Sequence, residues 1–314
     1  MRDTLERLAC EGAAPADAAG LAASARSGDV DAMAGLAGLW LHVAASAPHL
    51  VVPVYDATCA GWTGSAPQAP AVAPGGSATP IPAEFWDAFW SLVTDPATGS
   101  DAGEITVRTA ALSGMVDPSL RHAVATAALA YPGVTDAVAT GWPEPFTLAA
   151  LEVCPPGSIG HALYRLVIDN GFDLEVLDRS TLDLDALPEP LGWLNARILQ
   201  CHDLWHQLGG YDTTVLHEVA ISGFQLGQFG HHYSSMFLAV TLATAVARQP
   251  LGVPIVVETV VAAYRHGRET PPLLGVPWQQ LWHRPIDDLR DHLGVAPFAS
   301  PFPADLIEQL TAAG

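Results

Sequence analysis

Four side chains of the types that bind divalent metal ions fall within seventeen residues of this sequence: His202, Asp203, His206 and Glu218. Three of them belong to the segment HDLWH, and eleven residues separate that segment from the glutamate. Each residue of an α-helix turns by about 100°, so Asp203 lies about 100° and His206 about 40° around the helix from His202. Two imidazoles and a carboxylate then project from one side of the helix, and these are ligands that Zn²⁺ or Fe²⁺ accepts. The spacing therefore predicts a divalent metal site.

A second helix must supply Glu218. Gly209 and Gly210 follow His206 within one turn, and residues 212–214 are Asp, Thr and Thr, which are good N-caps for a new helix. We therefore expect a helix, a tight glycine turn and a second helix, with the metal site between the two helices.

A stripe of polar, uncharged residues follows the glutamate. No Asp, Glu, Lys or Arg occurs between Val219 and Ala247, and polar side chains recur there at intervals of three or four: Ser222, Gln225, Gln228, His232 and Ser235. The stripe predicts a pocket wall in which Ser222, Gln225 and Gln228 bind substrate and His232 acts on it, because solvent-facing helices usually carry Lys and Glu. An ordinary polar face toward water is the alternative.

Composition limits the partners. The chain has 314 residues, 50% of them hydrophobic, which is enough for a full core. Thirteen basic and thirty-three acidic residues give a net charge of −20, which repels nucleic acid and disfavours peripheral contact with anionic membranes. We expect a small-molecule substrate and no nucleic acid.

Cysteine spacing and hydropathy indicate the compartment. Cys10, Cys59, Cys154 and Cys201 are far apart and form no CxxC pair, and the chain begins without a secretory leader pattern, so we expect a reduced, cytoplasmic environment. The longest uncharged run includes His231 and His232 with several glycines and glutamines, so no transmembrane segment is expected.

Helical periodicity dominates the chain. We expect helices within residues 1–50, where Asp29 or Asp31 would cap an alanine-rich helix, and a Pro/Gly/Ala-rich loop over 57–82. Val51, Val52, Val54 and Tyr55 could form a short edge strand, but two residues on either side of Pro53 are too few to make a sheet. Further helices are expected over 85–93, 106–112, 120–129, 148–153, 159–170, 191–208, 215–247 and 254–266. The predicted fold is all-α: a multi-helix bundle, with an N-terminal helical extension (1–82) and a metal-binding domain (83–314).

Three segments resemble the coenzyme Q (ubiquinone) biosynthesis protein 4 family: PPGSIGHALYRLVIDNGF from Pro155, HDLWHQLGGY from His202 with Glu218 after it, and the tail AYRHGRETPPLLGVPWQQLWHRPIDDLRDHLGV that ends at Val295. The resemblance is strongest over residues 148–295. It implies an all-helical fold in which His202, Asp203, His206 and Glu218 hold zinc near a site for a prenylated ring. It also implies quinone-ring tailoring, in which a hydroxyl replaces a ring carboxylate by oxidative decarboxylation.

The sequence departs from the family pattern at two positions near the motif. His217 stands where the family commonly has glycine, and Gly209 stands where it commonly has threonine. We expect His217 to add a proton-transfer group to the site, with a solvent-facing imidazole as the alternative. These changes are compatible with a related aromatic substrate from a specialised pathway.

Other residues have a functional and a structural interpretation. Arg165, one turn after His161, is a candidate catalytic residue that could bind a substrate carboxylate or phosphate, and a surface ion pair is the alternative. The helix N-terminus at 157–160 offers amides that could bind an anion. Tyr264 and Arg268 match the family's tail pattern and are predicted to reach the substrate, whereas Trp278, Leu281 and Trp282 are predicted to be core or contacts between helices.

The ligand set allows three functions. A metal ion with an open position could chelate a ring carboxylate and phenolate and stabilise the charge left when carbon dioxide departs. Zinc is redox-inert and would leave dioxygen to react with the ring directly, whereas iron, the alternative metal, could activate dioxygen. A scaffold that presents a hydrophobic ligand to biosynthetic partner enzymes and a His-Asp-type hydrolase are the alternatives. A homo-oligomer is compatible with each function.

Overall fold

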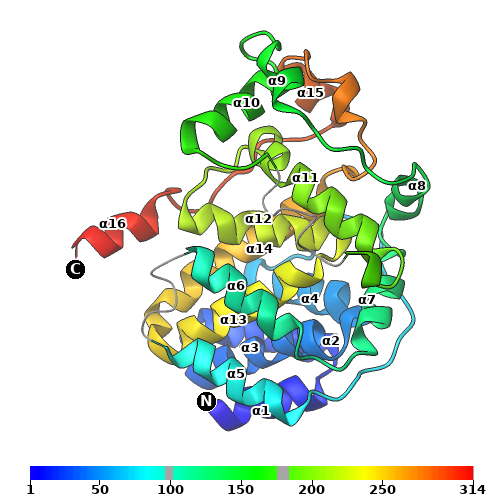
Figure 1. The fold of residues 1–314 in the computed structure, drawn as a ribbon. Coiled ribbons are helices and arrows are strands. Elements are labelled where there is room, and N and C mark those ends of the chain that lie inside the picture. The colour runs from blue at the N-terminus through cyan, green and yellow to red at the C-terminus, as the bar shows by residue number, and fades with distance from the viewer. Residues whose placement is uncertain (96–101, 175–183, 314) are drawn as a thin grey trace. The chain divides into compact units, whose positions relative to one another are not determined.

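The protein is described by a computed structural model that covers residues 1–95, 102–174 and 184–313. All regular secondary structure in these ranges is helical, so the predicted all-α fold is confirmed (Figure 1). The chain divides into two compact units: unit 1 comprises residues 1–131, 214–269 and 300–314, and unit 2 comprises residues 132–213 and 270–299. The predicted boundary at residue 82 does not coincide with a boundary between these units.

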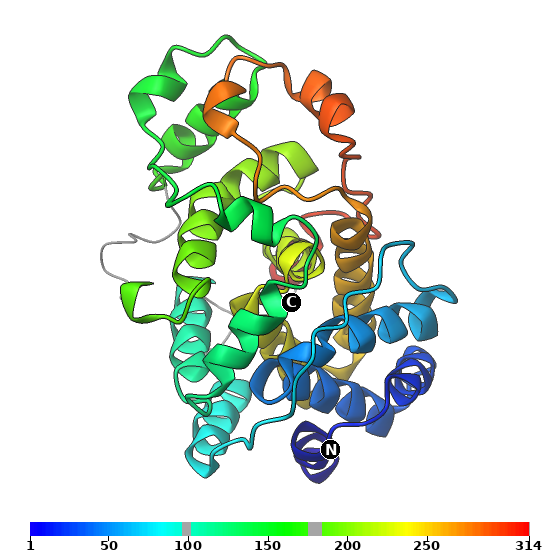
Figure 2. The same ribbon diagram turned by 90° about the vertical axis from the view of Figure 1, so that its right-hand side faces the viewer.

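Unit 1 contains the N-terminal helices together with three long helices from the second half of the chain. Its helices are α1 (Arg2–Glu11), α2 (Pro15–Arg26), α3 (Val30–Ala45), α4 (Val51–Thr63), α5 (Ala83–Thr94), α6 (Ala102–Ser113), α7 (Leu120–Ala128), α12 (Val215–Phe229), α13 (His232–Arg248), α14 (Val253–Glu269) and α16 (Leu306–Ala313), with 3₁₀ turns at Pro48–Leu50 and Pro250–Gly252. Residues 64–82 form an extended connection between α4 and α5 (Figure 2).

Helix α3 is the most completely buried helix of the N-terminal region. The Asp29 carboxylate accepts hydrogen bonds from the amides of Asp31 and Ala32, both at 3.0 Å, which confirms Asp29 as the predicted cap. Every residue from Ala32 to Ala45 is buried. Helices α1, α2 and α13 pack against α3, so the alanine-rich segment forms part of the core of unit 1.

Unit 2 contains the predicted metal-binding helix. Its helices are α8 (Val134–Val138), α9 (Leu148–Glu152), α10 (Ile159–Asn170), α11 (Leu191–Gly209) and α15 (Ile286–Leu293), with 3₁₀ turns at Leu184–Ala186 and Trp278–Gln280. Helices α10 and α15 pack against α11. Trp278 and Trp282 are buried, as predicted for core residues.

Two segments differ from the expected elements. Residues 51–55 are helical, although no helix was expected there, and the loop begins at Gly64 rather than at residue 57, because α4 continues to Thr63. The buried Val51, Val52 and Val54 belong to a helix that packs against α2 and α14, so tertiary packing outweighs the β propensity of valine.

The predicted helix over 215–247 is two helices. Gly230 adopts a left-handed conformation with φ of 63° and ends α12. A side chain at this position would also collide with the Tyr131 ring, since a Cβ would lie 2.6 Å from it. The predicted polar stripe is therefore divided between α12 and α13.

No helix in the described parts of the chain combines the length and the apolar character that crossing a bilayer requires.

Candidate metal centre

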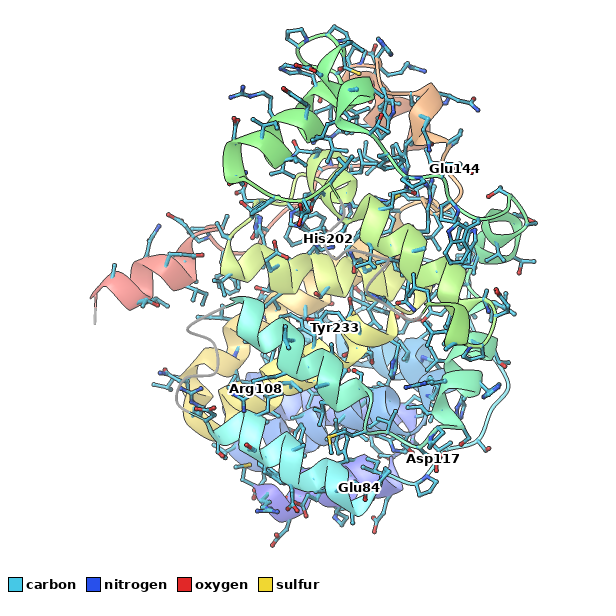
Figure 3. All side chains as sticks on the ribbon, viewed as in Figure 1. Glu84, Arg108, Asp117, Glu144, His202 and Tyr233 are labelled. Carbon is cyan, nitrogen blue, oxygen red and sulfur yellow. The ribbon has the colours of Figure 1, made fainter. Side chains whose placement is uncertain are left out.

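Helix α11 has an apolar side and a side that carries the three candidate metal ligands. Its buried apolar residues are spaced by three or four positions: Leu194, Ile198, Cys201, Leu204, Trp205 and Leu208. These positions cover one side of an α-helix, and His202, Asp203 and His206 fall on the remaining side. Burial of the apolar side thus fixes the direction in which the three polar residues project, and Figure 3 labels the first of them, His202.

The three polar side chains converge as the sequence predicts. One ligand atom from each of His202, Asp203 and His206 lies within 4.8 Å of the other two. The two Nε2 atoms of the histidines are 3.1 Å apart. Two nitrogens that bind one tetrahedral zinc ion, each at about 2.0–2.1 Å, are separated by roughly 3.3 Å, so these imidazoles fit a shared ion. Asp203 and His206 are only 8% and 1% exposed, which places the ligand atoms where water competes weakly.

The glycine turn after α11 sets the orientation of the His206 ring. Gly210 is left-handed (φ 74°) and ends the helix, and the amide of Tyr211 donates to the His206 carbonyl at 3.0 Å. This turn brings the Tyr211 carbonyl within 3.2 Å of Nδ1 of His206. A carbonyl only accepts hydrogen bonds, so Nδ1 carries the proton and Nε2 of the neutral ring keeps its lone pair for a metal.

The last carbonyls of α11 are capped from the C-terminal part of unit 2. Arg290 donates from Nη2 to the Gln207 carbonyl at 3.0 Å and from Nε to the Leu208 carbonyl at 2.8 Å. The amide of Phe298 donates to the Gly209 carbonyl at 2.7 Å. The helix end that carries His206 is therefore fully hydrogen-bonded. The sequence analysis missed Arg290, because nothing in the sequence pairs it with residues more than eighty positions earlier.

A second arginine holds the middle of α11. Arg197 is buried and donates to the carbonyls of Leu274 (2.9 Å) and Val276 (2.5 Å) and to the side-chain oxygen of Gln200 (2.7 Å). The Gln200 amide in turn donates to the Glu144 carbonyl at 2.5 Å. These bonds attach α11 to two other segments of unit 2, and the sequence analysis did not identify them.

Glu218 and His217 lie at the start of α12, in unit 1. The carboxylate of Glu218 is half-buried in the first helical turn, where the helix dipole favours a negative charge. His217 is 4% exposed, which rules out the solvent-facing alternative. Metal binding by Glu218 and proton transfer by His217 stay predictions.

The polar residues of α12 are buried rather than exposed to water. Ser222, Gln225 and Gln228 are each less than 9% exposed, so the alternative of a solvated face is wrong. The Gln228 amide donates to the Gly267 carbonyl at 2.7 Å, and Oε1 of Gln225 is 3.1 Å from Nδ1 of His231. Two of the three side chains thus have partners within unit 1, and their role in substrate binding stays a prediction.

His232 lies at the start of α13 instead of on the α12 stripe. Its Nε2 donates to the Ala44 carbonyl at 2.8 Å, and burial lowers the pKa of the imidazole. With Ser235 and Tyr131 it borders a small cavity of unit 1 that is lined mainly by apolar side chains. The predicted catalytic role of His232 is untested, and its place on the stripe is wrong because Gly230 breaks the helix.

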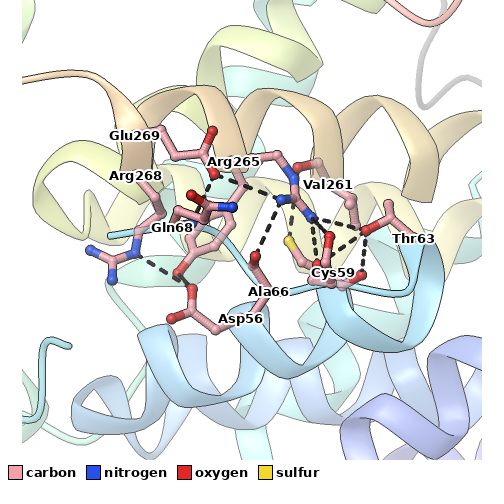
Figure 4. A network of polar contacts seen from close by, with 11 residues as sticks. Asp56, Cys59, Thr63, Ala66, Gln68, Val261, Arg265, Arg268 and Glu269 are labelled. Carbon is pink, nitrogen blue, oxygen red and sulfur yellow. Dashed lines mark hydrogen bonds and ion pairs between the residues drawn. The ribbon is translucent and has the colours of Figure 1, made fainter. Parts of the chain in front are cut away.

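A polar network joins α4, the connection after it and α14, and Figure 4 labels Arg268 and Asp56 among its members. Tyr264 belongs to the same network. The carboxylate of Asp56 accepts hydrogen bonds from the Tyr264 hydroxyl at 2.9 Å and from Nε of Arg268 at 3.5 Å. Nη2 of Arg268 donates to the Pro70 carbonyl at 2.6 Å. The network gives both residues a structural role in unit 1, and their predicted contact with substrate is untested.

Arg165 and the start of α10 have structural partners. Arg165 forms an ion pair with Asp169 at 2.6 Å, with more than half of the arginine side chain exposed, which is the structural alternative considered for it. Its predicted catalytic role is untested. The amides of Ile159 and Gly160 donate to carbonyls of residues 284 and 282, both at 3.0 Å. The expectation of amides available to an anion is wrong here, since the chain uses them itself.

The fold and the site define a helical protein with a candidate divalent metal centre on one buried helix. The family model for coenzyme Q (ubiquinone) biosynthesis protein Coq4 matches residues 102–299, more than half of the chain. The chain therefore belongs to the Coq4 family, as the resemblance indicates.

Individual relatives agree with this assignment. The chain is 31% identical over 149 residues to the mitochondrial ubiquinone biosynthesis protein COQ4 homolog of Drosophila erecta (46% of this chain, 52% of the relative). It is 29% identical over 153 residues to the homolog of Mus musculus (48% of this chain, 54% of the relative). The chain thus spans about half the length of these relatives.

A crystal structure of a protein from Nostoc punctiforme, described as a ubiquinone biosynthesis protein, has a similar fold. The TM-score is 0.51 at 24% sequence identity, and the match covers 67% of this chain and 96% of that one.

Proposed function

We propose that this protein is a metal-dependent enzyme of ubiquinone or related quinone biosynthesis that removes a ring carboxylate from an aromatic, optionally prenylated, substrate and replaces it by a hydroxyl. The observation that carries the proposal is the pair of imidazole Nε2 atoms 3.1 Å apart, with the Asp203 carboxylate beside them. Membership of the Coq4 family supports the pathway. Glu218 is included as the fourth ligand because of the sequence motif.

A divalent ion in this site would act as a Lewis acid toward the ring carboxylate and a neighbouring phenolate. The protein's own residues prepare for that role. The Tyr211 carbonyl holds the His206 ring with Nε2 directed at the ligand cluster, and Asp203 supplies a negative charge that favours a cation. Burial of Asp203 and His206 limits competition by water.

The proposed reaction balances with dioxygen as oxidant. The bond between the ring carbon and the carboxylate breaks, carbon dioxide leaves, and the electron pair stays on the ring carbon. That pair forms the bond to one oxygen atom of dioxygen. The other oxygen atom leaves as water. A hydride donor supplies two electrons and one proton, and solvent supplies two more protons, which together complete the phenol and the water molecule.

The test measures metal content and turnover together. The full chain is loaded with Zn²⁺ or Fe²⁺ and given hydroxybenzoates with and without a prenyl tail, together with a hydride donor such as a reduced nicotinamide, under ¹⁸O₂ and under argon. We expect the parent to release carbon dioxide and to incorporate ¹⁸O into the ring hydroxyl. The Asp203→Asn variant should lose this turnover, and its metal affinity should fall by at least about 100-fold. The exposed Asp287→Asn change is the matched control.

Full turnover by metal-free protein would refute the proposal. Metal binding without turnover of any substrate would instead favour a ligand-presenting scaffold with a structural ion. The Glu218→Ala variant tests the fourth ligand. We expect its metal affinity to fall. An unchanged metal affinity and turnover rate would remove Glu218 from the site.

A further inference from the structure

The guanidinium of Arg290 donates hydrogen bonds to main-chain carbonyls of α11, the helix that carries the candidate metal ligands. Its Nε and Nη2 atoms donate to the carbonyls of Leu208 and Gln207, the last residues of α11 before the glycine turn. Nη1 lies 3.0 Å from the carboxylate of Asp287, which is 91% exposed. An ion pair that exposed contributes little, so the two bonds to carbonyls are the substantial contacts of this side chain.

These bonds lie where a helix most needs a cation. The final carbonyls of an α-helix have no partners in the helix, and they form the negative end of its dipole. The planar fork of a guanidinium can bind two neighbouring carbonyls at once, which an ammonium group matches poorly. Arg290 therefore restrains the turn of α11 that contains His206.

That turn is also the one that orients the His206 ring. The amides of Gly210 and Tyr211 both donate to the His206 carbonyl, at 2.9 and 3.0 Å, and the Tyr211 carbonyl then receives the proton of Nδ1. The Tyr211 ring stacks on Phe298, with centroids 4.6 Å apart. If the last turn of α11 loosened, the Tyr211 carbonyl would shift relative to Nδ1, and the tautomer that carries its proton on Nδ1 would lose its advantage.

We propose that Arg290 is a positioning residue of the metal centre: by capping the carbonyls of Gln207 and Leu208 it holds the Tyr211 carbonyl against His206 and so keeps Nε2 of His206 available as a metal ligand. The inference rests on the proposed metal site, and it adds a residue outside the HDxxH motif to that site.

The test compares Zn²⁺ affinity, measured by competition with a chelator, among variants of the full chain. Arg290→Gln removes the fork and the charge, and we expect its affinity to fall about 10–100-fold, the range typical of groups that orient metal ligands. Arg290→Lys keeps the charge and should recover part of this loss, ending about 3–10-fold below the parent. Asp287→Asn leaves the bonds to the carbonyls intact and should bind within about twofold of the parent, as should Arg7→Gln, a remote exposed arginine on α1.

A spectroscopic measurement separates positioning from general stability. In metal-free protein with ¹⁵N-labelled histidine, the His206 ring should be protonated at Nδ1 in the parent and become a mixture of tautomers in Arg290→Gln. The signal is assigned by its loss in His206→Gln. A folded Arg290→Gln protein with the parent's affinity and tautomer would overturn the inference. If that variant does not fold, Arg290→Lys with both properties unchanged would do the same. An Asp287→Asn variant as weak as Arg290→Gln would also refute the capping argument. Failure of the parent itself to bind either Zn²⁺ or Fe²⁺ would instead refute the proposed function.

Discussion

Three histidines of this protein each have a ring nitrogen that donates to a backbone carbonyl, and this contact fixes which nitrogen carries the proton. His206 uses the Tyr211 carbonyl, His42 uses the Ala9 carbonyl at 2.8 Å and His232 uses the Ala44 carbonyl at 2.8 Å. At His206 the second nitrogen lies near the candidate ligand atoms of His202 and Asp203, and there the same contact would serve the proposed metal site. Elsewhere it stabilises a neutral imidazole within the core.

His42 predicts a pH dependence of stability. Burial lowers the pKa of its imidazole in the folded protein, whereas the unfolded chain has the ordinary value of about 6.5. Above pH 6.5 its stabilising effect is complete, and it is lost as the pH falls from 6.5 toward the folded pKa, because the unfolded state binds the proton first. Urea unfolding at pH 7.5 and 5.5 should show a smaller loss of stability in His42→Gln than in the parent. Equal losses in both proteins would contradict this assignment.

The candidate metal ligands could be predicted from the sequence, but the groups that hold them in place could not. The identity and spacing of His202, Asp203 and His206 were enough to predict that they converge, because an α-helix fixes the angles between nearby positions. Arg290 and the Tyr211 carbonyl act through contacts that depend on tertiary structure. A main-chain oxygen has no sequence signature, and an arginine on another helix gives no sign of which carbonyls it will reach.

At the scale of elements, glycines determine how closely α12 and α14 approach. A Cβ on Gly227 would lie 2.5 Å from the Tyr264 carbonyl oxygen, and a Cβ on Gly267 would collide with the Phe224 carbonyl. The two backbones are therefore in direct contact, and the amide of Gln228 bonds across the same interface to the Gly267 carbonyl.

Gly267→Ala should consequently destabilise the protein, because a backbone carbonyl cannot move away as a flexible side chain can. We expect a loss of about 1–3 kcal/mol or more in the free energy of unfolding, measured by urea titration. Gly20→Ala on α2 is the matched control, since a Cβ there has open space and alanine should be neutral or stabilising by up to about 1 kcal/mol. Similar stabilities for the two variants would show that the close approach of α12 and α14 is not needed.

The helices themselves were predicted well where periodicity and caps agreed. Helix α10 occupies the predicted residues 159–170, with Ser158 as its cap, and α5 and α14 extend only slightly past their predicted ends. The break at Gly230 was missed because hydrophobic and polar periodicity continues through it, and a single glycine does not reveal whether its φ is positive. Residues 51–55 were misjudged because valine propensity is local, whereas the burial of α4 is not.

Across the molecule as a whole, arginine side chains make many of the hydrogen bonds that join distant segments. All thirteen basic residues are arginine, against thirty-three acidic residues. Many of them donate to main-chain carbonyls far away in the sequence: Arg26, Arg197, Arg248, Arg265, Arg268 and Arg290. Six of the thirteen arginines thus hold distant segments together, and the excess of acidic residues gives the chain its net charge of −20.

Metal binding should stabilise the protein as a whole and protect α11 in particular. Zinc at about 100 times its dissociation constant should add about 2.7 kcal/mol to the free energy of unfolding, and removal of the metal with a chelator should reverse the gain. Hydrogen exchange should slow at the amides of α11, and slowing in the first turn of α12 would support Glu218 as a ligand. Asp203→Asn should abolish these effects, and equal stabilisation of that variant would place the ion elsewhere.

The pairing of α3 with α13 has a consequence for biogenesis. Roughly 190 residues separate the end of α3 from the beginning of α13, although the two helices pack against each other. At about 5–20 residues per second, a ribosome needs on the order of 10 to 40 s to synthesise that interval. During that time, the side of α3 that packs against α13 in the folded protein stays uncovered. The nascent chain therefore needs chaperone protection for a prolonged time. Expression at lower temperature, or with added chaperones that bind nascent chains at the ribosome, should raise the yield of soluble protein.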